Sequence, residues 1–433
     1  MSVGLRRVAV VGAGMVGLST AWFLQEKGVE VTVIDREGVA SGASWGNAGW
    51  LTPAIATPLP EPAVLRYGIN AVLSANSPVY VPPKADPRLA RFVAGFMRHS
   101  TTGRWNTAMQ ALIPVNDQSL AAFDHLTSNG VKGETIATEQ FIAGYTDVAA
   151  VKTLLEEFKQ IAAAGGHVDH ELISGDEARR REPAVADSVE AAVLIRGQRY
   201  VDPPAFVDAL ADAVRERGGE IVIGSQVTEL EDRGRQVKLD ATAGGAGTYD
   251  AVVVATGAWL GDLVHHYGVT QVVQAGRGYS FSVQTDHMPG GPLYFPEHRV
   301  AITPLGDRLR VAGMMELRRP DEPLDPRRIQ AIVGSTRDLL RGADLDDRQD
   351  EWVGSRPCTA DGLPLVGATD SERIFVAGGH GMWGITLGPI TGQLLTEQMV
   401  TGQVPEALTP FDPRRKLSWA PSRLRRASAA EAG

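Results

Sequence analysis

The chain has 433 residues, of which 43% are hydrophobic and 21% are charged, and this composition is that of a folded globular protein. One hydrophobic core does not serve so long a chain, so we expect two lobes. The net charge of −9 argues against broad nucleic-acid binding, which needs a basic surface. The single cysteine, Cys358, excludes an intrachain disulfide and a cysteine metal cluster, and it is compatible with a reducing cytoplasm.

The N-terminal segment predicts a strand, a helix and a second strand. Arg7 to Val11 is a short apolar run, Met15 to Lys27 has helical character and stops at Gly28, and Glu30 to Ile34 is apolar again. This succession predicts a βαβ unit.

The middle of the chain predicts an insertion, after which α/β alternation resumes. Residues from Thr52 to about Pro87 are rich in proline and lack periodicity. The elements predicted after them are helices at Leu89–His99 and Asp117–Ser128, a helix at Ala205–Arg217, and strands at Glu220–Ile223 and Ala251–Ala255.

From Gly278 the apolar pattern changes to a period of two, which predicts an antiparallel sheet. The alternating residues are Tyr279, Phe281, Val283, Val300, Ile302, Leu309 and Val311. A helix at Pro326–Leu340 closes this lobe, and a strand at Ile374–Ala377 with a helix after Leu387 returns to the first lobe. The lobes therefore alternate along the sequence.

Glycines between the first strand and its helix predict a dinucleotide site. They belong to the segment Gly12-Ala13-Gly14-Met15-Val16-Gly17. They permit a tight turn, close approach of the backbone to a pyrophosphate and tight helix packing, and the helix N-terminus then faces negative charge. Asp35 ends the second strand, where a carboxylate can accept hydrogen bonds from ribose and disfavours NADP. A glycine turn without a ligand is the alternative.

The loop Ser44-Trp45-Gly46-Asn47-Ala48-Gly49-Trp50 offers small and polar residues against which a flat ring can lie. Its start also fits GxSxG, which would make Ser44 a hydrolase nucleophile. That nucleophile requires a turn between a strand and a helix, whereas Ser44 stands in a glycine-rich loop. We therefore expect a binding loop, with a plain loop and a serine hydrolase as alternatives.

Further segments, together with these, resemble the FAD-dependent D-amino acid oxidase family, most closely its bacterial D-amino acid dehydrogenase and D-hydroxyproline dehydrogenase branch. They are Ala255-Thr256-Gly257-Ala258-Trp259, Arg277-Gly278-Tyr279-Ser280, Trp352-Val353-Gly354-Ser355-Arg356-Pro357, Asp361-Gly362-Leu363-Pro364 and Gly379-His380-Gly381. They follow the family's order over nearly the whole chain.

The resemblance implies an FAD site. Its residues would be Gly12, Gly14, Met15, Val16, Gly17, Asp35, Arg36, Ser44, Asn47, Ala48, Gly49, Val227, Ala255, Gly257, Arg356, Gly381, Met382, Trp383, Gly384, Ile385 and Thr386. A simple core valine is the alternative for Val227. Cys358 does not fall where the sarcosine oxidase branch links its flavin, so we expect non-covalent FAD.

The resemblance also implies three residues in the catalytic site. Arg356 would bind the substrate carboxylate, since a guanidinium group grips it with two hydrogen bonds, although an interlobe salt bridge is the alternative. Tyr279 would lie beside the substrate, or inside a core. His380 would stand at the flavin edge as a positional residue and not as a base, because hydride transfer needs only a neutral amine. We expect no metal site.

The predicted function is oxidation of the CH–NH bond of a D-amino acid by hydride transfer to flavin N5, giving an imine, then a 2-oxo acid and ammonia. Ala301 stands where glycine oxidases tend to have a tyrosine, which favours the dehydrogenase branch and a roomier pocket. The alternatives are a cyclic imino acid such as D-proline or hydroxy-D-proline, an N-substituted amino acid, and a non-catalytic flavoprotein subunit. Oxygen, a quinone or a partner protein would accept the electrons.

The predicted fold is α/β, with a Rossmann-like FAD-binding domain interleaved with an antiparallel-sheet substrate domain. FAD-binding parts would span 1–55, 149–265 and 349–412. The substrate domain would consist of a helical insertion at 56–148 and an antiparallel sheet at 266–348, and a basic tail would span 413–433. No stretch is long and apolar enough for a spanning helix, so we expect a cytoplasmic protein. We expect the basic tail to be a solvated terminus, with contact between its arginines, such as Arg414 and Arg423, and anionic lipid at the inner face of the membrane as the alternative.

Overall fold

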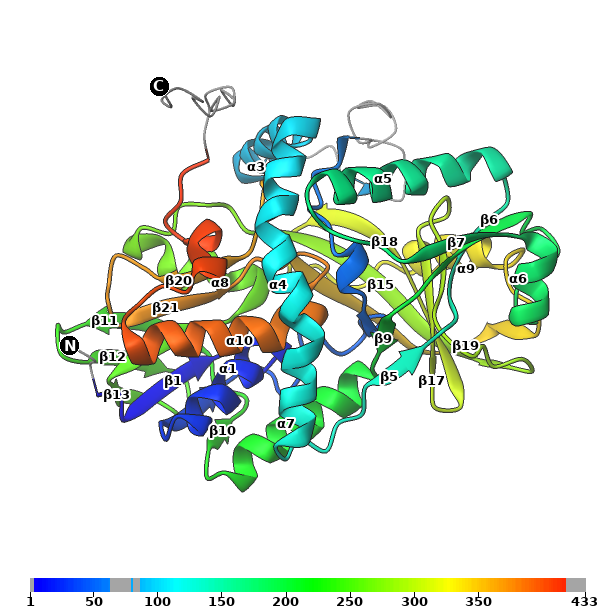
Figure 1. Ribbon diagram of the computed structural model, residues 1–433. Helices are drawn as coiled ribbons and strands as arrows, with labels where there is room; N and C mark the ends of the chain where they lie inside the picture. Colours follow the sequence, from blue (N-terminus) through cyan, green and yellow to red (C-terminus); the bar gives the residue numbers. More distant parts are fainter. Residues whose placement is uncertain (1–3, 63–78, 81–85, 418–433) are drawn as a thin grey trace, which may run out of the picture.

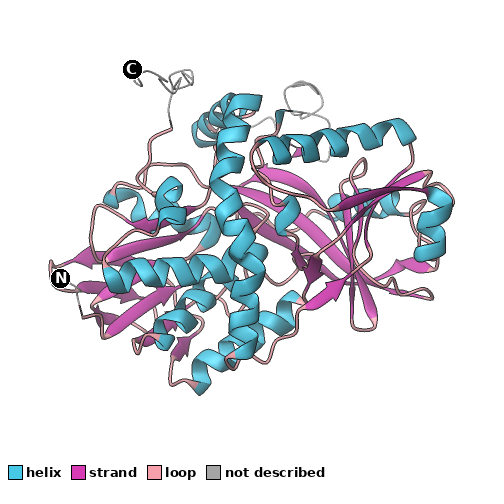
Figure 2. Cartoon of the chain, viewed as in Figure 1, coloured by secondary structure: helices cyan, strands magenta, loops and turns pink. Residues whose placement is uncertain are grey.

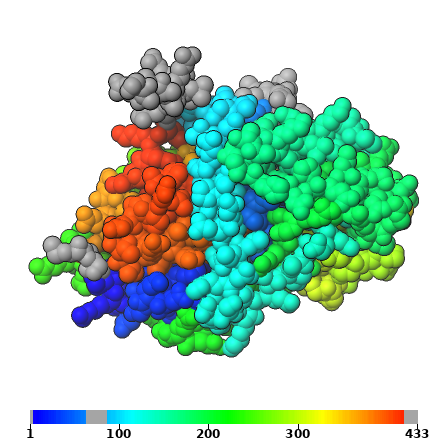
Figure 3. Space-filling model, in the orientation of Figure 1, coloured from blue at the N-terminus to red at the C-terminus, as the bar shows by residue number. Residues whose placement is uncertain are grey.

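The computed structural model describes residues 4–62, 79–80 and 86–417, which form two lobes side by side (Figure 1). One lobe holds a mostly parallel sheet and the other a large antiparallel sheet (Figure 2). The long helix α4 (Thr102–Ser128) lies on the surface between them (Figure 3). The predicted fold class is therefore confirmed.

The parallel sheet places the first glycine turn at a point where strand order reverses. Across the sheet its strands are β10 (Glu220–Val222), β2 (Glu30–Ile34), β1 (Arg7–Val11), β14 (Ala251–Val254), β21 (Ile374–Gly378) and β20 (Leu365–Ala368). Every neighbouring pair is parallel except β20 with β21. The chain leaves β1 toward β2 on one side and returns to β14 on the other. Open α/β sheets bind ligands at the carboxyl ends of strands at such a point.

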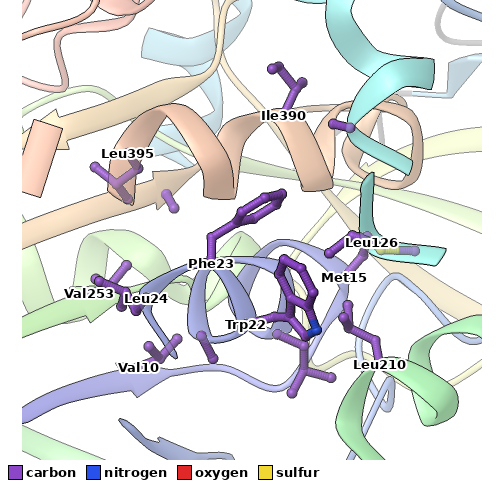
Figure 4. Packing of buried hydrophobic residues seen from close by; sticks show 14 of the residues in the cluster. Val10, Met15, Trp22, Phe23, Leu24, Leu126, Leu210, Val253, Ile390 and Leu395 are labelled. Carbon is purple, nitrogen blue, oxygen red and sulfur yellow. The ribbon is translucent and has the colours of Figure 1, made fainter. Parts of the chain in front are cut away.

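Helices α1 (Met15–Glu26) and α10 (Gly384–Thr401) cover one face of this sheet together with α7 (Pro203–Glu216). Figure 4 shows the rings of Trp22 and Phe23 in the core between them. A Cβ atom at Gly392 would lie 2.7 Å from the backbone nitrogen of Thr20, so glycine lets α10 approach α1 closely. This contact sets how closely the two helices pack.

The antiparallel sheet forms the second lobe. Its strands, in order, are β19 (Ala343–Cys358), β15 (Gln274–Thr285), β18 (Arg308–Arg318), β17 (Val300–Leu305), β16 (Leu293–Phe295), β6 (Phe141–Tyr145), β8 (Ala191–Ile195) and β7 (His170–Ser174), with β4 (Val79–Tyr80) beside β18. Two pairs, β16 with β6 and β18 with β4, are parallel.

The two faces of this sheet differ in chemistry. The residues predicted from the period of two lie on one face and form a core with α9 (Pro326–Thr336). On the other face, the register places small side chains in one row, Ser280 opposite Ala312 and Ala312 opposite Ala301. Ser280 donates a hydrogen bond to the carbonyl of Gly46, so this second face meets the first lobe. Small residues, flanked by Trp352 and Tyr294, therefore lie on the face toward the first lobe.

The remaining elements surround these sheets. They are α3 (Pro87–His99), α5 (Val151–Ala163), α6 (Gly175–Arg181) and α8 (Leu260–Val264), the sheet of β11 (Val227–Asp232), β12 (Val237–Ala241) and β13 (Gly247–Tyr249), the sheet of β3 (Trp50–Leu51), β9 (Gln198–Tyr200) and β5 (Ile136–Thr138), and the short 3₁₀ helix η3 (Gly257–Trp259). None of the described helices has the length and apolar character that crossing a bilayer requires.

Strand pairing differs from the predicted domain limits in two stretches. Strands β7 and β8, expected in the second FAD-binding part, pair within the antiparallel sheet, as does most of β19. The reason is that β8 (Ala191–Ile195) is uniformly apolar and buried, so its sequence does not show which sheet it joins.

Two local predictions also need correction. Helix α4 begins at Thr102 and not at Asp117, since the helix continues without a break through the internal Pro114. In the predicted basic tail, Arg415 is not a solvated side chain but forms an ion pair of 2.9 Å with the buried carboxylate of Asp361. Arg423 lies outside the described residues.

Candidate functional site

A cavity of about 340 Å³ runs between the lobes from the carboxyl end of β1 to the end of β19. Gly12, Gly14 and Asp35 line one part of it, and Ser355 and Arg356 line another. Two helices begin at its wall, since Met15 at the start of α1 and Gly384 at the start of α10 both line it. The free N–H groups of both helix N-termini favour negative charge in the cavity.

The glycine turn after β1 adopts the geometry that a nucleotide site needs. Gly12 has a φ of +115°, and a Cβ atom there would lie 2.5 Å from the carbonyl oxygen of Ala255. A Cβ atom at Gly17 would lie 2.0 Å from the carbonyl oxygen of Gly12, so Gly17 sets the packing of α1 and does not line the cavity. Each glycine thus has its own role in the turn.

Asp35 holds the turn and borders the cavity. One carboxylate oxygen accepts a hydrogen bond of 2.9 Å from the N–H of Ala13, and the other accepts from Glu37 and Gly38. A carboxylate has about four acceptor sites, so it can still accept a ribose hydroxyl. Its neighbour Arg36 also lines the cavity, and its guanidinium carbon lies 3.9 Å from the ring centroid of Trp259.

The loop from Ser44 to Gly49 joins the two lobes. The N–H of Met15 donates a hydrogen bond of 3.3 Å to the Ser44 hydroxyl, and the Asn47 side chain accepts one of 2.9 Å from the N–H of Gly49. Thr303 of the antiparallel sheet donates to the carbonyl of Ala48 at 2.6 Å. Ser44 and Asn47 line the cavity, whereas Ala48 and Gly49 support the loop from behind.

This geometry does not support a serine hydrolase. Ser44 lies in a run of turns and not between a strand and a helix. In the described part of the chain, its hydroxyl is bonded to the N-terminus of α1 and to no histidine or carboxylate. A nucleophilic serine needs such a base.

The loop before α10 closes the other part of the cavity. Gly381, Met382, Gly384 and Ile385 line it directly. Two predicted residues hold this loop instead: the indole of Trp383 donates a hydrogen bond of 2.7 Å to the carbonyl of Thr57, and the Thr386 hydroxyl donates one of 2.9 Å to Trp50.

Arg356 brings a cation to the same cavity. One nitrogen of its guanidinium group donates a hydrogen bond of 3.0 Å to the carbonyl of Met314, whose φ is +60°. The described part of the chain pairs no carboxylate with it, and burial lowers the pKa of the Arg356 side chain. A half-buried cation with no counter-ion among the described residues favours an anionic ligand.

Of the two predicted positions of Tyr279, beside the substrate or inside a core, the structure shows the one inside a core. Its side chain is fully buried on the α9 side of the sheet, where its hydroxyl donates a hydrogen bond of 2.9 Å to Glu316. Gly278, one residue earlier, faces Arg356. Since successive side chains of a strand point to opposite faces, Tyr279 belongs to the core and does not line the cavity.

His380 lines the cavity, and its Nε2 lies 2.9 Å from the hydroxyl of Thr391. Burial lowers the pKa of this imidazole to about 4. It is therefore neutral at neutral pH and oriented by Thr391, as a positional residue would be.

A family model described as FAD dependent oxidoreductase (DAO) matches residues 7–398. The chain belongs to this family. Its fold is similar to that of glycine oxidase from Geobacillus kaustophilus, with 23% identity, a TM-score of 0.74 and coverage of 95% of this chain and 99% of the other. It is also similar to L-proline dehydrogenase from P. horikoshii, with 17% identity, a TM-score of 0.67 and coverage of 95% and 97%.

The cavity of this FAD-dependent oxidoreductase fits an extended, anionic dinucleotide. Thr256 lines it, and the hydroxyl oxygen of Thr256 is buried without a hydrogen-bond partner among the described residues. Bound FAD would satisfy such a group, whose burial is otherwise costly. Val227 borders the cavity and its side chain lies in a core, while its contact with FAD stays a prediction.

The family resemblance located many of the residues around the cavity and missed others. The predicted residues that line it are Gly12, Gly14, Met15, Val16, Asp35, Arg36, Ser44, Asn47, Val227, Ala255, Gly257, Arg356, His380, Gly381, Met382, Gly384 and Ile385. Thr256, Trp259 and Ser355 also line it and were not predicted. Their positions inside the quoted family segments were the available signal.

Proposed function

We propose that this FAD-dependent oxidoreductase oxidises the CH–NH bond of a D-amino acid and holds its FAD without a covalent bond. The observation that carries the proposal is the position of Arg356, a half-buried cation in the same cavity as the glycine turn. An amino acid has a carboxylate beside the carbon that is oxidised. A guanidinium group at one end of the cavity therefore fixes that carbon relative to the flavin.

The sheet that carries Arg356 would leave room for the rest of the substrate. On its face toward the first lobe, small side chains run from Ser280 through Ala312 to Ala301, between the aromatic residues Trp352 and Tyr294. This supports a substrate with a side chain or a ring. A cyclic imino acid such as D-proline therefore stays the second candidate, since small residues accommodate both kinds of substrate.

Bound FAD supplies the acceptor for the hydride. The chain itself would orient the substrate carboxylate through Arg356 and exclude water through the loop that contains Met382. The N-terminus of α10, at Gly384, would lie beside negative charge on the cofactor and stabilise it. His380, held neutral by burial, would keep the loop in position and take no proton.

Cys358 supports non-covalent binding of FAD. Its thiol is buried beside Gly276 and is not among the residues that line the cavity, and burial raises the pKa of the thiol to about 12. A protonated, enclosed thiol is a poor nucleophile.

An anaerobic absorbance titration tests the function. Purified protein would be titrated with D-proline, cis-4-hydroxy-D-proline, D-alanine, larger D-amino acids and the L-enantiomers. Bleaching of the flavin band by a D-substrate supports the proposal, and admission of air then separates an oxidase from a dehydrogenase. A yellow protein that none of them bleaches contradicts it.

Replacement of Arg356 tests the role of the guanidinium group. In Arg356→Ala we expect kcat/KM to fall about 100-fold or more, because a buried charged hydrogen bond is lost, while flavin content stays unchanged. Arg341→Ala removes an exposed arginine of the same lobe and serves as the control. Unchanged kinetics in Arg356→Ala would remove this residue from the site.

A further inference from the structure

The loop between β18 and α9, residues 319–325, connects the antiparallel sheet to the mouth of the cavity. Three hydrogen bonds fix it to that sheet. Ser355 donates to the carbonyl of Pro320 at 3.1 Å, Arg277 donates to Pro323 at 3.2 Å, and Arg318 donates to Glu322 at 2.8 Å. The loop is therefore a fixed part of the second lobe.

From this loop, Asp321 reaches two residues that line the cavity on the other lobe. The indole N–H of Trp259 donates to its two carboxylate oxygens at 3.0 and 3.2 Å. The guanidinium group of Arg36 lies 3.3 Å from the nearer oxygen and stacks on the Trp259 ring at 3.9 Å. Each pair among the three side chains is thus in contact.

This cluster lies at the part of the cavity formed after β2. Arg36 follows Asp35 directly, and Trp259 follows the glycine-containing segment after β14. Asp321 does not itself line the cavity. Its effect on a ligand would act through the two side chains that it holds.

We propose that Asp321 is a positioning residue that holds Trp259 and Arg36 against bound FAD and slows release of the cofactor. The inference rests on the proposed assignment of this cavity to FAD. The side chain of Asp321 is 66% exposed, so it fixes its partners without being part of a core. The second lobe thereby contributes to retention of a cofactor bound mainly by the first.

The rate of FAD release tests this inference. The flavin-loaded full chain is diluted, and the rise in fluorescence of released FAD is followed over time. We expect release to be about 10-fold faster in Asp321→Ala, because a charged hydrogen bond and an ion pair are lost together. Asp321→Glu should restore much of the retention.

Two further variants separate positioning from folding. Trp259→Phe keeps an aromatic ring but removes the N–H donor, so Asp321→Ala should accelerate release less in this background than in the wild type. Asp307→Asn alters an exposed carboxylate of the same lobe and should release FAD as the wild type does. The melting temperature of the FAD-free protein should be the same in all of them.

The possible outcomes are distinct. Release from Asp321→Ala within twofold of the wild-type rate would overturn the inference while leaving the proposed function intact. A lower melting temperature of FAD-free Asp321→Ala, with no coupling to Trp259→Phe, would also overturn it. A chain that takes up no FAD would overturn both proposals.

Discussion

The guanidinium group of Arg356 lies against the backbone of Gly278, where a Cβ atom would come within 2.2 Å of the guanidinium carbon. Arg356 is on β19 and Gly278 is on the neighbouring strand β15. Gly278 pairs with Gly354, which lies on β19 two residues before Arg356. The absence of a side chain at Gly278 thus decides where the cation of the cavity lies. One nitrogen of the same guanidinium group donates a hydrogen bond to the Met314 carbonyl.

Gly278→Ala should therefore displace Arg356 without removing it. We expect kcat/KM to fall about 100-fold, because displacement of a substrate-binding group by about 1 Å costs that much. FAD content, measured from the absorbance of the purified protein, should stay the same.

The matched control is Gly334→Ala in α9, where a Cβ atom meets nothing within 4 Å. This variant should keep wild-type kinetics. Equal kinetics of Gly278→Ala and Gly334→Ala would show that the position of Arg356 does not matter for turnover.

Asp35→Asn should weaken FAD binding. The amide oxygen can still accept from the N–H groups of Glu37 and Gly38, but the NH2 group then replaces the oxygen that accepts from Ala13, and the charge is lost. We therefore expect the Kd for FAD to rise about 10-fold. The Kd is measured by fluorescence quenching of FAD added to FAD-free protein. Asp212→Asn, an exposed change on α7, is the control. An unchanged Kd would mean that Asp35 serves only the backbone.

The sequence predicts the cofactor end of the site better than the substrate end. The glycine turn and Asp35 lie on successive elements of one βαβ unit, so their spacing in the chain reflects their spacing in the fold. Tyr279 and Gly278 are adjacent, and a register shift between Arg277 and Tyr279 is not visible in the residue pattern. Which of the two faces the cavity depends on pairing with a strand far along the chain.

The same contrast between signals local in the chain and pairing with distant strands explains which parts of the fold were predicted. Elements with strong local signals, such as the strand Arg7–Val11, begin and end as predicted. Strand β8 has no such signal for its partner, because a short buried run suits either sheet. Asp321 lies in a loop after β18, and nothing in its neighbours along the chain indicates Trp259 as its partner.

His380 should leave no inflection in the pH profile of turnover. Its pKa is lowered to about 4 by burial, so it stays neutral across the range in which substrate amines titrate. The rate of anaerobic flavin reduction between pH 5.5 and 9 should have the same shape in His380→Gln and the wild type. If the rate of flavin reduction in the wild type changes near the ordinary imidazole pKa, and this change is absent from His380→Gln, His380 acts as a base.

The stability of the folded chain should fall with rising pH because of Glu157. Burial first, and then the charge of Glu61, raise the pKa of the Glu157 carboxyl from 4.5 to about 8. Thr57, bonded to this carboxyl at 3.2 Å, opposes the shift. Between these two pH values the folded state keeps a proton that the unfolded chain has lost, so the free energy of unfolding decreases as the pH rises through this window.

Glu157→Gln removes that titration. Compared with the wild type, the variant should gain about 1–3 kcal/mol in the free energy of unfolding between pH 5 and pH 9, measured by denaturant titration at each pH. Glu156→Gln, one residue earlier on α5 and exposed, should show the wild-type pH dependence. If Glu157→Gln and Glu156→Gln respond alike, the carboxyl of Glu157 is ionised at neutral pH, and Arg299, whose charge lowers its pKa, then dominates over burial.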